Sequence, residues 1–229
     1  MQTKRVTNRS DQPASDRVRV RRRRERGRYD RSTIDAILDE GLIAHLGIVE
    51  EDGRPVVLPM LHARRGDLIY LHGSPAGRGL GALAAGAPVC VTVSLLDGLV
   101  LARAAMHHSA NYRSVMLLGQ AANVVDPAEK LAALQAIVEH IVPGRWKDVR
   151  APSTNELKAT SVVAIGIDEA SAKLRTGPPI DDEEDHSSPA WAGVIPFLTQ
   201  IGCPEPDPRL CVGIEPPTYV SAYRRPGGP

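Results

Sequence analysis

Short apolar runs, separated by residues that favour turns, dominate the chain from residue 43 onward. Residues 43–49, 55–63 and 68–72 are each long enough for one strand. Asp52-Gly53 and Arg65-Gly66-Asp67 stand between these runs, and both are typical of the tight turns that join antiparallel neighbours. The pattern therefore predicts consecutive antiparallel hairpins.

Further strands are expected in the second half of the chain. Residues 89–95 alternate between apolar and polar side chains, and Asp97-Gly98 is expected to reverse the chain so that residues 99–105 return alongside. Two more strands are expected over about 112–125 and 161–167. Because no β-α-β alternation is present, the pattern favours a mainly β fold with inserted helices, a six-or-more-stranded antiparallel split β-barrel, over a Rossmann sheet.

Three helices are expected among the strands. Ser32, three residues before Asp35, predicts the cap of a first helix that ends at Gly41. A glycine-rich second helix is expected over about 75–85. Asp126-Pro127-Ala128-Glu129 has the form of a capping box with proline at the first helical position. The third helix, which it opens, carries a predicted apolar stripe of Leu131, Leu134, Val138 and Ile141.

Basic charge is concentrated near the N-terminus. The chain has 28 Lys and Arg against 27 Asp and Glu, so a strongly basic surface can come only from a local cluster. Residues 17–28 supply one, with four consecutive arginines at 21–24. A block of like charges repels itself, so residues 1–28 are expected to form a disordered arm that cofactor binding does not require. Two interpretations stay open for the arm: a solvated tail, or a contact with nucleic acid or another anionic surface.

One domain is expected, at residues 29–197, followed by a proline-rich C-terminal extension at 198–229, because 229 residues with 42% hydrophobic content suit a single core. No apolar run approaches the roughly 20 residues of a membrane span. The first residues also lack the apolar stretch of a signal peptide, so a soluble, cytoplasmic protein with no membrane partner is expected.

No metal site is predicted. Cys90, Cys203 and Cys211 show no Cys-x-x-Cys spacing. His107 and His108 are adjacent on an expected strand end, so their side chains should point to opposite faces. The acidic run at 181–185 is expected to be a solvated loop, with metal binding as the less favoured alternative.

The first candidate site is the segment His72-Gly73-Ser74-Pro75-Ala76-Gly77-Arg78, where a strand leads into the N-terminus of a helix. Ser74 can cap that helix, whose free N–H groups favour an anion. Arg78 lies four residues beyond Ser74 on the same side and can hold two phosphate oxygens, while Gly73 allows a close backbone approach. The alternatives are an ordinary capped helix and a structural His72 at a strand end.

The second candidate site is the start of the strand at 112–125, where an amide, a phenol, a guanidinium and a hydroxyl stand together. Such a set suits recognition of a planar heterocycle with carbonyl and N–H edges. The alternative is an ordinary strand whose solvent-exposed face carries these polar side chains without binding a ligand. The segment comprises Asn111, Tyr112, Arg113, Ser114 and Val115.

Together these segments resemble the pyridoxamine 5'-phosphate oxidase-like FMN-binding split barrels, in the flavin-nucleotide-binding branch that includes the nitroimidazole-resistance (Nim) proteins. The resemblance covers roughly residues 26–197 and implies a homodimer with FMN at the subunit interface. With it, Ser74 and Arg78 are assigned to the phosphate, Gly73 to a close backbone approach to the cofactor, and His72 to a place near the flavin as the candidate catalytic residue. It places the remaining candidates beside the ring and ribityl chain: Pro59, Met60, Leu61, Asn111, Tyr112, Arg113, Ser114 and Val115, with Trp191 beside the ring or the partner subunit.

The resemblance also implies a function, that of an oxidoreductase. We expect a flavoprotein that passes hydride or electrons from NAD(P)H through FMN to an unidentified small-molecule acceptor. The alternative is a flavin- or haem-binding module without turnover. Vitamin B6 oxidation is not expected, because Arg224-Arg225 does not match the C-terminal arginine and histidine arrangement of the true oxidases.

Overall fold

The computed structural model describes residues 12–75, 83 and 86–225. Most of the predicted helix at 75–85 therefore lies outside the described residues. The helices are α1 (Arg31–Glu40), α3 (Pro127–Ile141), α4 (Thr154–Lys158) and α5 (Thr218–Ser221). The strands are β1 (Gly27–Arg28), β2 (Ile43–Val49), β3 (Pro55–Arg65), β4 (Leu68–Gly73), β5 (Pro88–Leu101), β6 (Ser109–Asn123), β7 (Ser161–Gly166), β8 (Glu169–Arg175) and β9 (Gly193–Pro196).

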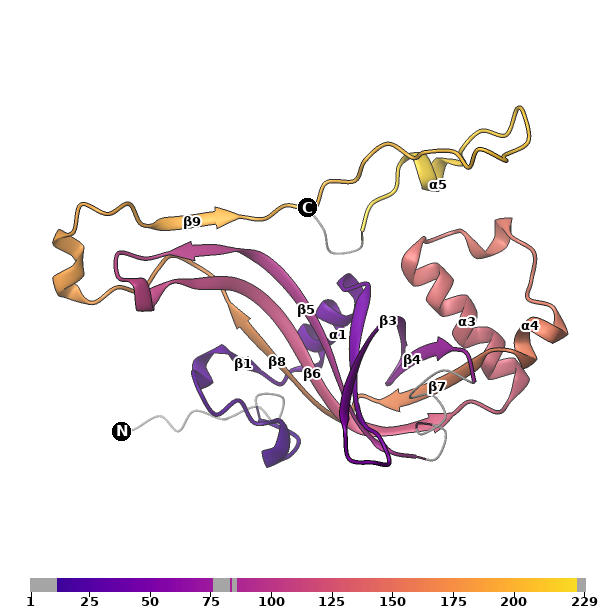
Figure 1. Cartoon of the computed structure of the whole chain (residues 1–229), viewed down its shortest axis with the longest axis horizontal. Coiled ribbons are helices and arrows are strands. Elements are labelled where there is room, and N and C mark those ends of the chain that lie inside the picture. The colour runs from indigo at the N-terminus through magenta and orange to yellow at the C-terminus, as the bar shows by residue number, and fades with distance from the viewer. Residues whose placement is uncertain (1–11, 76–82, 84–85, 226–229) are drawn as a thin grey trace, which may run out of the picture.

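Six of the described strands close into a ring, in the order β6-β7-β4-β3-β2-β5 and back to β6. Strand β6 closes the ring by branching: residues 112–118 pair with β8, and residues 121–123 pair with β7. All of these pairings are antiparallel, so the predicted mainly β barrel with inserted helices is confirmed. Figure 1 shows β5 and β6 running on together beyond the barrel toward β9, with α3 and α4 at the opposite end.

Strand β5 does not reverse where the sequence predicted a turn. It runs unbroken from Pro88 to Leu101, and its register against β6 shifts between Leu96 and Gly98. Asp97-Gly98 is thus a bulge inside one long strand, because an extra residue can be absorbed by bending a strand whose neighbours continue. A Cβ on Gly98 would lie 2.6 Å from the backbone oxygen of Ile195, so glycine allows β9 to approach.

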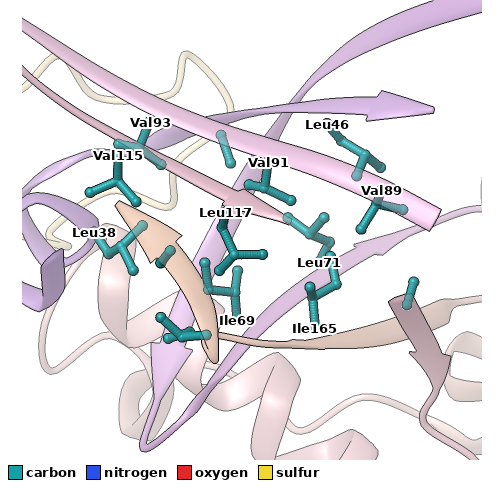
Figure 2. Close-up of a cluster of buried hydrophobic side chains, with 14 of the residues drawn as sticks. Leu38, Leu46, Ile69, Leu71, Val89, Val91, Val93, Val115, Leu117 and Ile165 are labelled. Atoms are coloured by element: carbon teal, nitrogen blue, oxygen red, sulfur yellow. The ribbon is translucent and has the colours of Figure 1, made fainter. Parts of the chain in front are cut away.

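The barrel interior is filled by aliphatic side chains (Figure 2). Helix α1 closes one opening with Ile34, Ile37 and Leu38, and a smaller cluster lies beneath α3. Each fully buried leucine or isoleucine contributes about 1.5–3 kcal/mol of transfer free energy. The side chains exposed by 1% or less include Leu46, Ile69, Leu71, Val91, Leu117 and Ile165.

The N-cap of α1 is Asp30, and the predicted cap Ser32 is wrong by two residues. The carboxylate of Asp30 accepts from the backbone N–H of Thr33 at 2.8 Å, and the Ser32 hydroxyl also donates to it at 2.8 Å. A carboxylate can accept two donors at once, and at Asp30 it holds both the N–H of Thr33 and the Ser32 hydroxyl, so the helix begins after Asp30. The helix ends at Gly41, as predicted.

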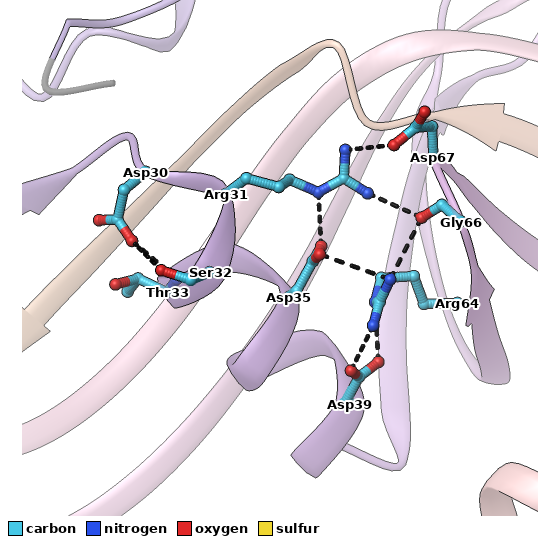
Figure 3. Close-up of polar contacts among 9 residues, drawn as sticks. All are labelled: Asp30, Arg31, Ser32, Thr33, Asp35, Asp39, Arg64, Gly66 and Asp67. Atoms are coloured by element: carbon cyan, nitrogen blue, oxygen red, sulfur yellow. Dashed lines mark hydrogen bonds and ion pairs between the residues drawn. The ribbon is translucent and has the colours of Figure 1, made fainter. Parts of the chain in front are cut away.

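Two arginines fasten α1 to the turn between β3 and β4 (Figure 3). Arg31 donates to Asp35 at 2.6 Å and to Asp67 at 2.7 Å. Arg64 on β3 donates to Asp39 at 2.8 Å, and both guanidinium groups also bond the backbone oxygen of the turn glycine. The network fixes the helix against the barrel rim.

The cap of α3 matches the sequence prediction only in part. Asp126 accepts from the N–H of Glu129 at 2.9 Å, as predicted, but the Glu129 carboxylate accepts from Tyr70 on β4 at 3.1 Å and does not complete the box. The predicted apolar stripe is also displaced, because Ala133 and Ile137 form the buried face and Leu131 is exposed. The small Ala133 faces the barrel, which lets the helix approach closely.

Side chains from three separate parts of the chain satisfy carbonyl groups at the C-terminal end of α1, which have no partner within the helix. They are His62 to Leu38 (3.0 Å), His140 to Gly41 (2.8 Å) and Arg225 to Glu40. The rings of His62 and His140 lie 5.0 Å apart. Through Arg225, the end of the C-terminal extension is anchored between α1 and α3.

Gly41→Ala is expected to lower the free energy of unfolding by about 2–3 kcal/mol, the upper range of overpacking costs. A Cβ at this position would lie 2.2 Å from the Cγ1 atom of Val93, whose side chain is fully buried and has no room to move. Urea denaturation measures the loss. Gly202→Ala is the control, because nothing lies within 4 Å of its added Cβ. Equal stability of the two variants would contradict the packing argument.

The basic arm is not disordered in the part that the structure describes. Short turns at Asp16–Val18 and Arg24–Arg26 lead into β1, which pairs with β8. The side chain of Val18 is fully buried, and the N–H of Val20 donates to the Tyr29 hydroxyl at 2.9 Å. The valines interspersed among the arginines thus give residues 16–28 an anchor that the charge pattern concealed. Among the described residues, no helix is long and apolar enough to cross a membrane.

Candidate cofactor site

Strand β6 divides the candidate residues 111–115 between its two faces. Tyr112 and Ser114 face the basic arm, where they line two neighbouring pockets. Arg113 lines a different cavity, and Val115 is 1% exposed within the barrel core, although it also borders the pocket that Ser114 lines. The alternation expected of a strand therefore separates residues that are adjacent in sequence.

The first arm-side pocket, called here the hydroxyl pocket, has a volume of about 310 Å³. The hydroxyl of Ser114 donates to the backbone oxygen of Lys173 on β8 at 3.2 Å. Valines of the arm and Met116 supply apolar surface beside these polar groups. Its polar lining comprises Thr92, Ser94, Ser114, Ser171 and Lys173, together with arginines of the arm.

The second arm-side pocket, called here the basic pocket, has a volume of about 350 Å³ and no carboxylate among its lining residues. It shares Arg22 and Lys173 with the hydroxyl pocket, so the two pockets adjoin. Tyr112 contributes a phenol to its wall. Its cations are Arg22, Arg23, Arg26, Lys173 and Arg175.

Arg175, which lines this pocket, is held in place by Asn111. Arg175 is 5% exposed, and its guanidinium donates to the Asn111 side-chain oxygen and to Pro178 at 3.0 Å. Its Nε has no hydrogen-bond partner among the described residues. Burial, and then the nearby charge of Arg26, lower the pKa of Arg175. Asn111, predicted as a cofactor contact, is 8% exposed. Its side-chain oxygen accepts from Arg175, and its side-chain N–H donates to the backbone oxygen of Gly177.

Arg113 is occupied by two carboxylates inside the chain. It donates to Asp97 at 2.8 and 3.0 Å and forms a two-pronged pair with Glu40 at the end of α1. Glu40 and then Asp97 raise its pKa. The cavity beside it, of about 580 Å³, is lined by the C-terminal extension and includes Phe197 and Arg225.

His72 lies in another part of the molecule, in a cavity of about 490 Å³ between β4, α3 and α4. Its Nδ1 is buried without a hydrogen-bond partner in the described part of the chain. Burial lowers the pKa of His72, so the ring is neutral near pH 7. The cavity walls are mainly apolar and include Leu134, Val138 and Trp146.

The remaining predicted residues are spread over the barrel. Pro59 is exposed on β3, Met60 packs against the barrel core, and Leu61 packs against the cluster beneath α3. Trp191 is 69% exposed just before β9. Gly73 ends β4, Ser74 follows it at the surface, and Arg78 lies outside the described residues. Within one chain, the structure therefore does not join His72 to Tyr112 and Ser114 in a single described pocket.

The arm arginines, Lys173 and Arg175 were not predicted as site residues. The arm's like charges pointed to solvent, and the only contrary signal was the pair Val18 and Val20 within the basic block. Lys173 and Arg175 are two residues apart on one strand and belong to the segment that carries the family resemblance, which could have marked them.

The acidic run also differs from the expected solvated loop at its first residue. The side chain of Asp181 is 1% exposed and accepts from the Arg103 guanidinium at 2.9 Å. His107, Asp181 and Asp185 bring possible metal-ligand atoms within 4.8 Å of one another. Asp181 is already neutralised by Arg103, and Asp182 is 74% exposed.

A family model described as pyridoxamine 5'-phosphate oxidase matches residues 30–174. The chain belongs to this family. The family match confirms the resemblance drawn from the sequence. No curated protein matches the chain.

Three solved structures resemble the chain over most of its length. The flavocytochrome Anf3 from Azotobacter vinelandii is 46% identical, covers 93% of this chain and 99% of its own, and has a TM-score of 0.88. The FAD and haem binding protein from Mycobacterium smegmatis is 36% identical, covers 89% of this chain and 100% of its own, and has a TM-score of 0.84. A candidate 5-nitroimidazole antibiotic resistance protein from Bacteroides thetaiotaomicron is 28% identical, covers 63% of this chain and 84% of its own, and has a TM-score of 0.54.

Proposed function

We propose that the protein is a flavin-dependent redox protein whose cofactor binds across the hydroxyl pocket and the basic pocket. The observation that carries the proposal is the junction of these pockets at Arg22 and Lys173. A flavin nucleotide combines a planar ring, a polyhydroxylated chain and an anionic end. Hydroxyl-bearing strand residues suit the first two, and cations without carboxylate partners suit the third. The two most similar structures described above are of a flavocytochrome and of an FAD and haem binding protein, which supports this assignment.

The chain's own residues have binding and orienting roles in this proposal. Ser114 and Thr92 offer hydroxyls to the ligand, and Lys173 offers charge. A bound flavin would supply the hydride or electron chemistry, with NAD(P)H as the donor and a small molecule as the acceptor. The sequence predicted FMN as the flavin. A hydride step itself requires no general base, and the described lining of the hydroxyl pocket, where the ring is proposed to bind, includes no carboxylate.

We also propose that the protein acts as a homodimer. His72 and Ser114, one from each candidate segment, lie in separate cavities of one chain, so pairing of two copies would be needed to bring them to one cofactor. Neighbouring apolar side chains on β5 and β9 are exposed, including Leu99 at 40% and its register partner Ile195 at 44%. Twofold pairing covers the same patch on each subunit.

A second candidate function is haem binding in the His72 cavity. The observation that favours it is a neutral histidine in a mainly apolar cavity that also includes Arg150 and Glu156, with a buried ring nitrogen that has no hydrogen-bond partner in the described part of the chain. Haem needs an apolar slot and an axial ligand, for which histidine is the commonest choice in globins and peroxidases. A bound haem would supply one-electron chemistry, and His72 would hold it in place.

The test is the visible spectrum of the purified protein, recorded together with light scattering. We expect flavin absorption bands that bleach on addition of NADPH, in a particle of twice the chain mass. A Soret band that is lost in His72→Ala, while the flavin bands remain, would support the haem site. A colourless protein that takes up no added flavin would overturn the proposal, and a monomer that retains flavin would overturn the dimer.

A further inference from the structure

The described part of the basic arm is folded and packs against β8. Arg17 pairs with Glu169 on β8 at 3.0 Å, and Val18 beside it is fully buried. Ten residues later, Gly27 pairs with Lys173. A Cβ on Gly27 would lie 3.1 Å from the Cβ of Val20, so the two ends of the arm close on each other. The arginines between these anchors are therefore held over β6 and β8.

The arginines of the arm fall into two groups. Arg19 and Arg21 pair with Asp16 at 2.7 and 3.0 Å. Arg22, Arg23 and Arg26, which line the basic pocket, have no carboxylate partner among the described residues. Like charges brought together at close range repel one another unless an anion lies between them.

Two local features show that this arrangement is held against opposing forces. Arg23 has a φ of 56°, and it is the one non-glycine residue with positive φ in the described ranges. Such a conformation persists only where the surrounding structure enforces it, and it is often found at ligand sites. On the facing strand, Arg175 buries a guanidinium nitrogen that lacks a partner.

We propose that the arm is a clamp for the diphosphate of a dinucleotide cofactor, with Arg22, Arg23 and Arg26 binding the phosphate oxygens from one side and Lys173 from the other. The inference rests on the proposed flavin site and makes FAD the preferred flavin. A diphosphate diester spreads its charge over four non-bridging oxygens, which matches cations distributed along a pocket better than one terminal phosphate does.

Apolar surface in the basic pocket supports a dinucleotide. Met106 and Ile180 line the pocket together with the cations and are 90% and 70% exposed. Tyr112 lines the same pocket. An adenine extending from the diphosphate would cover this surface, whereas FMN ends at its phosphate and would leave it exposed to water.

The test compares dissociation constants for FAD, FMN and riboflavin, measured by flavin fluorescence quenching on the full chain. In Arg26→Gln and in Arg22→Gln, the constant for FAD is expected to rise roughly tenfold to a hundredfold, that for FMN less, and that for riboflavin less than about twofold. Arg24→Gln is the matched control. It removes the same charge from the same turn as Arg26, but Arg24 lines neither pocket, so all three constants should change by less than about twofold.

Three results would overturn the clamp. Equal weakening of FAD and riboflavin by Arg26→Gln would mean that the arm shapes the ring site and not the phosphate site. An equal effect of Arg24→Gln would mean a general electrostatic attraction. Weakening of FAD by Arg78→Ala, with no effect of Arg22→Gln or Arg26→Gln, would place the phosphates at the helix that the sequence predicted. If the wild-type chain binds none of the three flavins, the proposed function itself fails, and the clamp fails with it.

Discussion

Arg113→Ala is expected to lower the free energy of unfolding by about 2–3 kcal/mol, which is at or below the lower end of the cost of removing one partner from a buried ion pair. Arg113 joins the end of α1, through Glu40, to the bulge of β5, through Asp97. The three side chains are only 29%, 16% and 29% exposed, so their charges are poorly hydrated. Without the guanidinium, two carboxylates would face each other unpaired.

Urea denaturation near pH 7 measures this loss, and Arg54→Ala provides a matched control. Arg54 also pairs with two carboxylates, Glu50 and Asp52, but its side chain is 72% exposed. Its loss should cost less than about 1 kcal/mol, the usual limit for exposed pairs. Equal losses in the two variants would show that Arg113 is not an internal brace. If Arg113→Ala folds but its flavin dissociation constant rises sharply, the result would support the direct contact between Arg113 and the cofactor that the sequence predicted.

Acidification from pH 6.5 to pH 4 is expected to destabilise the protein through His62. The side chain is fully buried, and burial, followed by the nearby His140, lowers its pKa to about 4. An unfolded histidine takes up its proton near pH 6.5, so between these pH values the unfolded chain binds more protons than the folded one. The free energy of unfolding then falls by about 1.4 kcal/mol per pH unit, roughly 3 kcal/mol in all.

The physical reason is that the folded protein has no place for a second proton on this ring. One nitrogen of His62 already donates to Leu38, and Nδ1 is buried with no hydrogen-bond partner among the described residues. The charge of Arg225, which docks at the same helix end, opposes protonation further. Burial also lowers the pKa of His140.

The slope of unfolding free energy against pH tests this account. His62→Gln keeps a donor for Leu38 but cannot titrate, so its slope between pH 6.5 and 5 should be smaller than that of the wild type by about 1.4 kcal/mol per unit. His186→Gln, at an exposed histidine, should leave the slope unchanged. If His62→Gln has the same slope as the wild type, the acid sensitivity arises from other groups.

Local patterns predicted those parts of the molecule that depend on neighbours along the chain. The hairpins from residue 43 to residue 73 follow from apolar runs with turn residues between them, and the end of α1 follows from Gly41. The choice of Asp30 as the cap and the continuity of β5 through Asp97 were mispredicted. In both cases the deciding interaction, with a second capping residue nearby or with a neighbouring strand, has no distinct signature at the position itself.

The same distinction applies to the candidate site. The amino-acid sequence by itself determined the family, the barrel and the presence of a polar segment on β6, because these depend on residue type and spacing. Only the tertiary structure decided that Asn111 and Arg113 are bound within the chain while Tyr112 and Ser114 face pockets. It also decided that the arm is packed, since the buried Val18 and the partly buried Val20 outweigh charge repulsion only when β6 and β8 supply the surface that covers them.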